Sequence, residues 1–286
     1  YTVPYGEGKY LYVAGLVDEY HLTFAVMAPS MLRFMQPFFE QVDMSSLKTC
    51  ILTAEACPKV LLETVYKYCP DVELYDFYGP TEATIYCTYY KLSRESENKE
   101  LNGIISIGKP LKHCVSIILD ENGNEVPIGE KGELCIAGPQ VTPGYWNNPE
   151  KNESSFFIRK YKDEDLRFYH TGDLTFQDRD GDIMYSCRMD NQVKIQGFRI
   201  ELGEIEYHAR VAIGKNLVCI ACESNGINEL YLVIEGEQFD TKEMVNYMKS
   251  KMPSYMIPTH IKFMEKFPLN NSDKIDRPKI KIEICR

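Results

Sequence analysis

One short motif combines three kinds of chemistry within five residues. It reads Tyr78-Gly79-Pro80-Thr81-Glu82 and follows a predicted strand. Gly79 and Pro80 fix an unusual loop backbone, because glycine accepts positive φ and proline locks φ. The loop therefore presents a ring that can stack on a base, a hydroxyl for phosphate and a carboxylate for Mg²⁺. This set suits a nucleotide, although a simple β-turn with a capping threonine would contain the same residues.

A second motif places a carboxylate on a glycine-containing turn. It reads Tyr169-His170-Thr171-Gly172-Asp173-Leu174. A turn of this kind can aim a carboxylate at the two hydroxyls of a ribose, and Asp173 is the candidate. The alternative is an ordinary turn aspartate with no ligand.

Two further motifs follow in the last third of the chain. The run from Arg188 to Glu206 is unusually dense in charge and glycine for a core element, and a solvated strand-turn-helix is the alternative. The run from Pro268 to Arg277 contains Lys274 in a polar turn, where it could equally be a plain surface lysine.

The ordered set of four motifs resembles the adenylate-forming superfamily of acyl-CoA synthetases, luciferases and nonribosomal peptide adenylation domains. Within it the chain is most similar to amino-acid adenylation domains and D-alanine–carrier protein ligases, and the resemblance runs over residues 20–282. The segments 132–150 and 255–258 add to it. The fold that this resemblance implies is α/β, a partial large domain followed by a small α+β domain.

The resemblance implies a nucleotide site in the first two motifs. Tyr78, beside Gly79, would stack on adenine. Thr81 would bind the α-phosphate and Glu82 the Mg²⁺ ion. The ribose hydroxyls would be held by Asp173 with help from Arg188.

The last two motifs imply a mobile part. Asp190 would be a hinge about which the small domain turns, and Lys274 would reach the α-phosphate and carboxylate during adenylation. Gly197 would later face the tunnel for a phosphopantetheine thiol.

Other site residues are expected from their position relative to the motifs. Glu55 is a candidate on the adenine side, in a loop that reads Ala54-Glu55 where the family usually has two glycines before the glutamate. Phe77, Ile85 and Tyr86 should line part of the acyl pocket, which suggests an apolar or small substrate side chain.

The implied reaction is ATP-dependent activation of an amino acid to aminoacyl-AMP and its transfer to an acyl or peptidyl carrier protein. The family's Ser/Thr/Gly-rich phosphate loop ending Pro-Lys-Gly does not occur in the 286 residues. We therefore expect a C-terminal fragment with little adenylation activity by itself. An acyl-CoA or aryl-CoA synthetase and a non-catalytic binding module are the alternatives.

Composition narrows the remaining classes. The net charge of −10 disfavours general binding to nucleic acid, because phosphate backbones are repelled. No apolar run reaches the roughly 18 residues of a membrane span, so we expect a cytoplasmic protein.

The ten cysteines are scattered, and buried free thiols are the expectation. In a strand, Cys219 and Cys222 would point to opposite faces.

The elements that must position these residues fall into three regions. Residues 1–95 are expected to form the end of an α/β subdomain, 96–188 a β-barrel-like subdomain, and 191–286 a small mobile α+β domain. In detail, Pro58 predicts the start of a helix. The β-branched and aromatic segment 84–90 predicts a strand, and Asp240 with Glu243 predicts a capping box.

Overall fold

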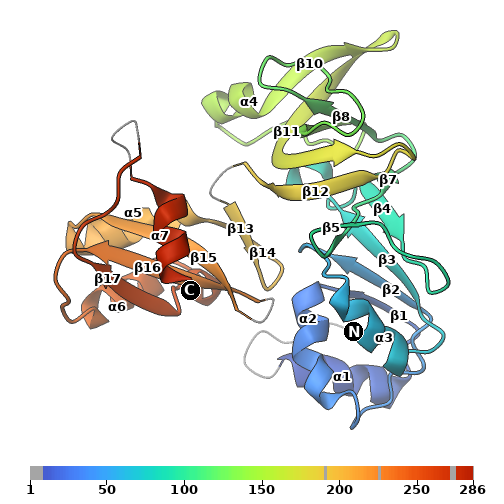
Figure 1. The fold of residues 1–286 in the computed structure, drawn as a ribbon, viewed down its shortest axis with the longest axis horizontal. Helices are drawn as coiled ribbons and strands as arrows, with labels where there is room; N and C mark the ends of the chain where they lie inside the picture. Colours follow the sequence, from blue (N-terminus) through green and yellow to red (C-terminus); the bar gives the residue numbers. More distant parts are fainter. Residues whose placement is uncertain (1–8, 190–191, 225–226, 271–274, 286) are drawn as a thin grey trace. The chain divides into compact units, whose positions relative to one another are not determined.

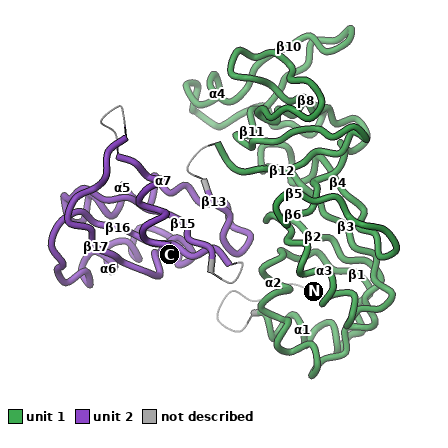
Figure 2. The backbone as a smooth tube through the Cα atoms, viewed as in Figure 1, with its two compact units in different colours: residues 1–190 green, residues 191–286 purple. Residues whose placement is uncertain are grey.

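The chain forms two compact units, residues 1–190 and 191–286 (Figures 1 and 2). The structure is a computed structural model that describes residues 9–189, 192–224, 227–270 and 275–285. Each unit has its own sheets and its own hydrophobic core, and each is described by itself.

The first unit begins with a mixed five-stranded sheet (Figure 1). Its strands, in spatial order, are β1 (Phe24–Met27), β2 (Thr49–Thr53), β3 (Glu73–Tyr78), β4 (Thr88–Lys91) and β7 (Lys109–Pro110). The first three are parallel and β4 is antiparallel to β3. This arrangement confirms the predicted α/β class.

Helices pack on this sheet through one face of the strands. They are α1 (Lys9–Tyr20), α2 (Pro29–Met35) and α3 (Val60–Tyr68), with a short η1 turn at Gln36–Phe38. The buried residues of β2 and β3 alternate along the strand, as a sheet with one covered face requires. Cys50, Leu52 and Leu74 therefore share a core cluster with Leu61 and Val65 of α3. Pro58 lies just before α3, close to the predicted start.

A second, antiparallel sheet completes the first unit. Its strands are β8 (Val115–Leu119), β9 (Gly132–Ala137), β10 (Phe156–Tyr161), β11 (Glu164–Gln177) and β12 (Ile183–Arg188), with α4 (Pro149–Ser155) before β10. The order is β10-β11-β9-β8, and β12 pairs with β11. A register shift in β11 between His170 and Leu174 bulges the strand at the second motif. Between β4 and β7 in sequence, β5 (Glu100–Leu101) and β6 (Ile104–Ile105) form a small pair.

The second unit is α+β, as expected. It starts with the hairpin β13 (Gln192–Ile195) and β14 (Phe198–Glu201), then continues with α5 (Leu202–Ile213), β15 (Leu217–Ser224), β16 (Ile227–Glu235), α6 (Lys242–Lys251), η3 (Ser254–Met256), β17 (His260–Met264) and α7 (Arg277–Ile284). β15 and β16 are antiparallel and β17 is parallel to β16. Alternate residues of β15 belong to two separate cores: Cys219 lies with residues of α5 and α6, while Cys222 lies with Ile280 of α7.

Two local predictions were wrong. The predicted strand 84–90 exists only from Thr88, because η2 (Thr81–Ala83) ends with Thr84 and Ile85 at φ of 52° and 73°. The predicted capping box does not form. Thr241 is the N-cap of α6 without a side-chain hydrogen bond, and Asp240 accepts the N–H of Lys242 instead.

The cysteines divide differently from the expectation. Cys222 and Cys285 form a disulfide, which ties β15 to the end of α7 and corrects the prediction that the thiols are free. The reason is geometric: the Cα atoms lie 5.4 Å apart although the residues are 63 apart in sequence. The other cysteines are free, and Cys219 and Cys222 face opposite sides of the sheet, as predicted.

Candidate functional site

The first motif lies where parallel strands end. Thr53 of β2 pairs with Phe77 of β3, so the loops that follow these two strands leave the same edge of the sheet. In open α/β sheets this carboxyl edge is where ligands bind. The two loops contain Glu55 and the Tyr78–Glu82 motif, which brings two of the expected regions of the site to the same edge.

Gly79 is required by a close backbone approach. A Cβ at this position would lie 2.4 Å from the carbonyl oxygen of Ile85. The approach is fixed by hydrogen bonds across the loop, from the N–H of Ile85 to the carbonyl of Pro80 at 3.3 Å and from the N–H of Cys87 to the carbonyl of Tyr78 at 2.8 Å. Any larger residue at position 79 would force this loop open.

Glu82 is braced from the antiparallel sheet. Its carboxylate Oε1 accepts a hydrogen bond from the Tyr145 hydroxyl at 2.5 Å, and its backbone carbonyl accepts the N–H of Thr142 at 2.8 Å. Thr84 Oγ1 donates to the carbonyl of Gln140 at 2.7 Å. The loop after β9 therefore holds the first motif in place. Burial, and the hydrogen bond to Glu82, raise the pKa of Tyr145, so its hydroxyl stays a donor.

The donor set at Glu82 fits Mg²⁺. This ion prefers one or two carboxylates together with phosphate oxygens and water. Glu82 is buried and supplies a carboxylate, and the exposed Thr81 hydroxyl lies next to it in the chain. Tyr145, whose place in the site was missed from sequence, orients that carboxylate from outside. The only signal for it was its position beside Gly144 in a segment that carried the family resemblance.

The second motif meets the first at Asp173. This carboxylate is 4% exposed. Its Oδ2 accepts the hydroxyl of Tyr78, which is 95 residues away in sequence, and its Oδ1 accepts Arg188 Nη1 at 3.0 Å. Arg188 also donates to the carbonyl of Thr171 at 2.6 Å. Three residues expected to hold a nucleoside therefore form one buried network.

The Asp173 carboxylate has the capacity to accept further hydrogen bonds. A carboxylate has roughly four acceptor sites, and Tyr78 and Arg188 use one each. Burial and the nearby charge of Asp173 hold the pKa of Tyr78 well above its usual range, so the phenol remains protonated and donates. The ring of Tyr78 is only 7% exposed, so an adenine stacked on it would use a small remaining face.

Glu55 has a hydrogen-bond partner that the sequence did not suggest. Its two carboxylate oxygens accept the backbone N–H and the hydroxyl of Ser30, both at 2.9 Å. They therefore join the loop after β2 to the N-terminus of α2. Ala54, where the family usually has glycine, adopts φ of 70°. This left-handed conformation is unfavourable for alanine.

Two of the three residues expected to line an acyl pocket are in contact. The rings of Phe77 and Tyr86 lie 5.1 Å apart between centroids, and Tyr89 packs on Phe77 at 5.7 Å. Tyr89 was not predicted to join this aromatic group, because alternation alone does not show which side chains of β4 lie beside Phe77. Ile85 is 58% exposed beside this aromatic group in sequence.

Of the expected residues Asp190, Gly197 and Lys274, the structure describes only Gly197. Gly197 follows Gln196 in the turn of the β13–β14 hairpin, at φ of 81° and 50°, as a two-residue hairpin turn requires. Asp190 and Lys274 lie outside the described residues. The chain that follows residue 274 is anchored, because Arg277 makes two hydrogen bonds of 2.7 Å to the buried carboxylate of Glu206.

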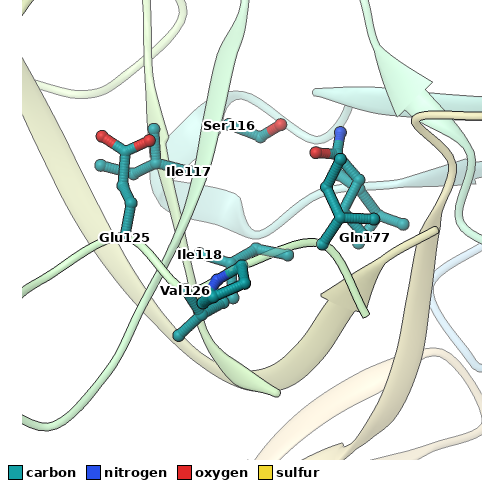
Figure 3. Close-up of a pocket in the computed structure, with 9 residues that line it drawn as sticks. Ser116, Ile117, Ile118, Glu125, Val126 and Gln177 are labelled. Atoms are coloured by element: carbon teal, nitrogen blue, oxygen red, sulfur yellow. The ribbon is translucent and has the colours of Figure 1, made fainter. Parts of the chain in front are cut away.

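A small cavity elsewhere in the first unit does not belong to this site (Figure 3). It has a volume of about 70 Å³ and lies between β8 and the segment around Val126, with Glu125 and Gln177 on opposite sides. Ligand pockets usually measure about 300–1,000 Å³, so a nucleotide does not fit there.

Comparison with known proteins agrees with the class that the fold and the motifs indicate, an α/β protein of the adenylate-forming type. The chain belongs to the AMP-binding enzyme family, whose model matches residues 7–146. The family prediction is thereby confirmed.

Curated relatives extend the match over nearly the whole chain. A linear gramicidin synthase of Brevibacillus parabrevis is 36% identical over 280 residues, which is 96% of this chain and 5% of that protein. Tyrocidine synthase 3 of the same organism is 36% identical over 250 residues, 84% of this chain and 4% of that protein. The chain thus spans a small part of these relatives.

Solved structures share the fold. The Vibrio cholerae adenylation domain AlmE, in complex with glycyl-adenosine-5'-phosphate, matches with a TM-score of 0.83 at 22% identity, over 99% of this chain and 53% of that one. Holo-PA1221, a protein with adenylation and carrier domains bound to a vinylsulfonamide inhibitor, matches with a TM-score of 0.81 at 23% identity, over 95% and 46%. Among the described residues, no helix is long and apolar enough to cross a membrane.

Proposed function

We propose that this chain is part of an ATP-dependent ligase that activates an amino acid as aminoacyl-AMP and passes it to a phosphopantetheine thiol on a carrier protein. The observation that carries the proposal is the buried network of Tyr78, Asp173 and Arg188 beside the braced loop of Thr81 and Glu82. Its two parts suit the nucleoside and the phosphates of one nucleotide. The similarity to peptide synthetases supports an amino acid as the substrate.

In the first half-reaction the substrate carboxylate attacks the α-phosphorus of ATP and pyrophosphate leaves. Asp173 holds the ribose hydroxyls, and the Thr81 hydroxyl binds an α-phosphate oxygen. Glu82, oriented by the Tyr145 hydroxyl, is the carboxylate that would hold Mg²⁺. When bound, this ion offsets the negative charge that grows as the two anions meet.

The second unit supplies the remaining cation in this proposal. Lys274 stabilises the charge on the α-phosphate and the carboxylate, as preorganised cations do in other phosphoryl-group reactions. Turning about Asp190 then withdraws Lys274 and brings Gly197 to the path of the thiol. The thiol attacks the acyl carbon of the adenylate, AMP leaves, and the thiol proton goes to solvent.

The substrate side chain is proposed to be small or apolar. Phe77, Tyr86 and Tyr89 present aromatic surface, and Ile85 adds an exposed aliphatic side chain. The chain by itself is proposed to have little adenylation activity, because the phosphate-loop sequence expected for the family does not occur in it.

The decisive experiment is ATP–pyrophosphate exchange by an intact enzyme that contains this chain, with amino acids tested against aryl and fatty acids. Exchange dependent on an amino acid supports the proposal. Exchange with aryl or fatty acids indicates an acyl-CoA or aryl-CoA synthetase, and nucleotide binding without any exchange indicates a non-catalytic module.

A matched pair of variants tests the site. A charged hydrogen bond contributes about 1.5–3 kcal/mol, so Asp173→Asn should lower kcat/KM for ATP by roughly 10–100-fold. The control is Asp163→Asn, an exposed aspartate in the turn between β10 and β11, which should leave the rate unchanged. Equal rates for the two variants would contradict the role of Asp173.

A further inference from the structure

Three metal-ligating side chains meet on the antiparallel sheet, outside the residues that the proposed reaction uses. Glu133 and Cys135 are two residues apart on β9, so they share a face, and His170 of β11 is the register partner of Cys135. One ligand atom from each lies within 4.8 Å of the others. His170 Nδ1 is 2.8 Å from Glu133 Oε2 and 3.6 Å from Cys135 Sγ.

One of the two distances matches a tetrahedral zinc site, and the other is shorter than such a site requires. With Zn–S near 2.3 Å and Zn–N near 2.05 Å, tetrahedral angles separate sulfur and nitrogen by about 3.6 Å. This matches the 3.6 Å between Cys135 Sγ and His170 Nδ1. The oxygen–nitrogen pair, now 2.8 Å apart, would have to widen to about 3.3 Å, a change that rotation of the Glu133 side chain can supply.

The charge balance also favours a divalent ion. One glutamate carboxylate and one cysteine thiolate add up to two negative charges, and neutral histidine adds none, so M²⁺ makes the cluster neutral. Neutrality matters because Cys135 is fully buried, and an unpaired charge there is costly. The side chain of His170 is 36% exposed, so a fourth ligand from solvent can reach the ion.

The surrounding groups hold the triad in shape without filling it. Glu133 Oε1 accepts the N–H of Gly172 at 2.9 Å, which leaves Oε2 toward His170. The ring of Phe157 packs on His170 with centroids 4.5 Å apart. Two arginines influence the site electrostatically, but Arg159 is paired with Glu125 and Arg188 with Asp173.

We propose that Glu133, Cys135 and His170 bind a thiophilic divalent cation of the Zn²⁺ class, with water as the fourth ligand. Binding displaces the Cys135 thiol proton to solvent, and it also displaces the second imidazole proton whenever His170 is protonated. The metal–sulfur bond replaces the S–H bond, with no change of oxidation state. Because Glu133 also binds Gly172, the ion is linked through one carboxylate to the turn that carries Asp173.

Protonation sets how the affinity should depend on pH. Burial raises the pKa of the Cys135 thiol, so metal binding must displace a tightly held proton. Zn²⁺ affinity should therefore increase as pH rises from 6 to 8.

The test uses Co²⁺ alone as a spectroscopic probe of the full 286-residue chain, without added thiol. We expect saturation at one ion per chain, with visible bands of tetrahedral Co²⁺ and a sulfur-to-cobalt charge-transfer band in the near ultraviolet. Zn²⁺ should bleach both. No saturable charge-transfer band, or an octahedral spectrum only, would overturn the proposal.

Variants assign the ligands. Cys135→Ser should abolish the charge-transfer band. His170→Gln, at a half-exposed position, should weaken Co²⁺ binding by more than the roughly 10–100-fold loss typical of an outer-shell partner. The control is Cys187→Ser, which removes an exposed free cysteine and should leave the spectrum unchanged. A charge-transfer band that survives Cys135→Ser but is lost in Cys187→Ser would refute the site. Circular dichroism of each variant separates lost binding from lost folding.

Discussion

The two units hold their expected catalytic segments by different means. In the first unit the loops around Tyr78 and Asp173 are held by buried hydrogen bonds and by backbone in the left-handed region. In the second, the chain that follows residues 271–274 is tied by the ion pair of Arg277 with Glu206 and by the disulfide of Cys222 with Cys285. The first arrangement depends on packing and the second on charge pairing and redox state.

Because the two units hold these segments differently, each unit should respond to a different kind of perturbation. A reductant should act on the second unit and leave the first unchanged, because the described disulfide lies in the second alone. A one-atom steric change should act most strongly on the first, because its loop leaves no room beside Gly79. Each unit's unfolding can be followed separately by hydrogen exchange and mass spectrometry in increasing urea.

The largest effect is expected from reducing the disulfide. Opening a loop of 63 residues should lower the free energy of unfolding of the second unit by about 4 kcal/mol, because the reduced unfolded chain gains conformational entropy. Dithiothreitol should shift the urea midpoint of residues 192–285 and leave residues 9–189 unchanged. Cys222→Ser should reproduce the shift, and an equal shift in both units would contradict the separation.

Breaking the ion pair should come next. Arg277→Met leaves the Glu206 carboxylate, which is 5% exposed, without its guanidinium partner. Removing one partner of a buried pair costs about 3–5 kcal/mol, and the lower end applies because the Arg277 side chain is 31% exposed. The double variant Glu206→Leu with Arg277→Met should recover part of the loss. A single variant as stable as the parent chain would show that the pair contributes little.

A smaller effect is expected from Gly79→Ala in the first unit. The added methyl would lie 2.4 Å from the Ile85 carbonyl oxygen, so the loop must shift, at a cost of about 2–3 kcal/mol. The matched control is Gly203→Ala, whose added Cβ would have no atom within 4 Å. Hydrogen exchange at β3 and β4 should accelerate only in the first variant.

The smallest effect has the opposite sign. Ala54→Gly should relieve a left-handed conformation that costs about 1–2 kcal/mol. Glycine also gives the unfolded chain more conformational entropy, which lowers the free energy of unfolding by about 0.4–1 kcal/mol. The expected net gain in the free energy of unfolding is therefore about 0.5–1 kcal/mol, confined to the first unit. A loss of stability would mean that the surrounding contacts already compensate the strain at Ala54.

Much of the fold could be predicted from hydrophobic periodicity and from residues that mark turns and helix starts. The helix predicted to start at Pro58 begins at Val60, because the φ angle that proline fixes is a local property of the chain. The strand expected over 84–90 failed at its first half. There, hydrogen bonds from Ile85 and Cys87 to the first motif decide the backbone, and β propensity carries no information about them.

The candidate site shows the same division. Tyr78, Asp173 and Arg188 were each selected from motifs, but their hydrogen bonds to one another became visible only in the fold. Tyr145, Tyr89 and Ser30 were missed as partners, because each is brought to the site by strand pairing or packing across at least 12 residues of sequence.

The sequence by itself determined the class of protein, the order of its motifs and most of its regular elements, because these depend on residue type and short-range spacing. Only the tertiary structure decided which side chains meet in a hydrogen bond, an ion pair, a disulfide or a cluster of metal-ligand atoms. These are, in that order, Tyr78 with Asp173, Arg277 with Glu206, Cys222 with Cys285, and the triad of Glu133, Cys135 and His170. Apart from Glu133 and Cys135, which are two residues apart on β9, these contacts join residues 35–95 positions apart, and no local pattern encodes a distance across the folded chain.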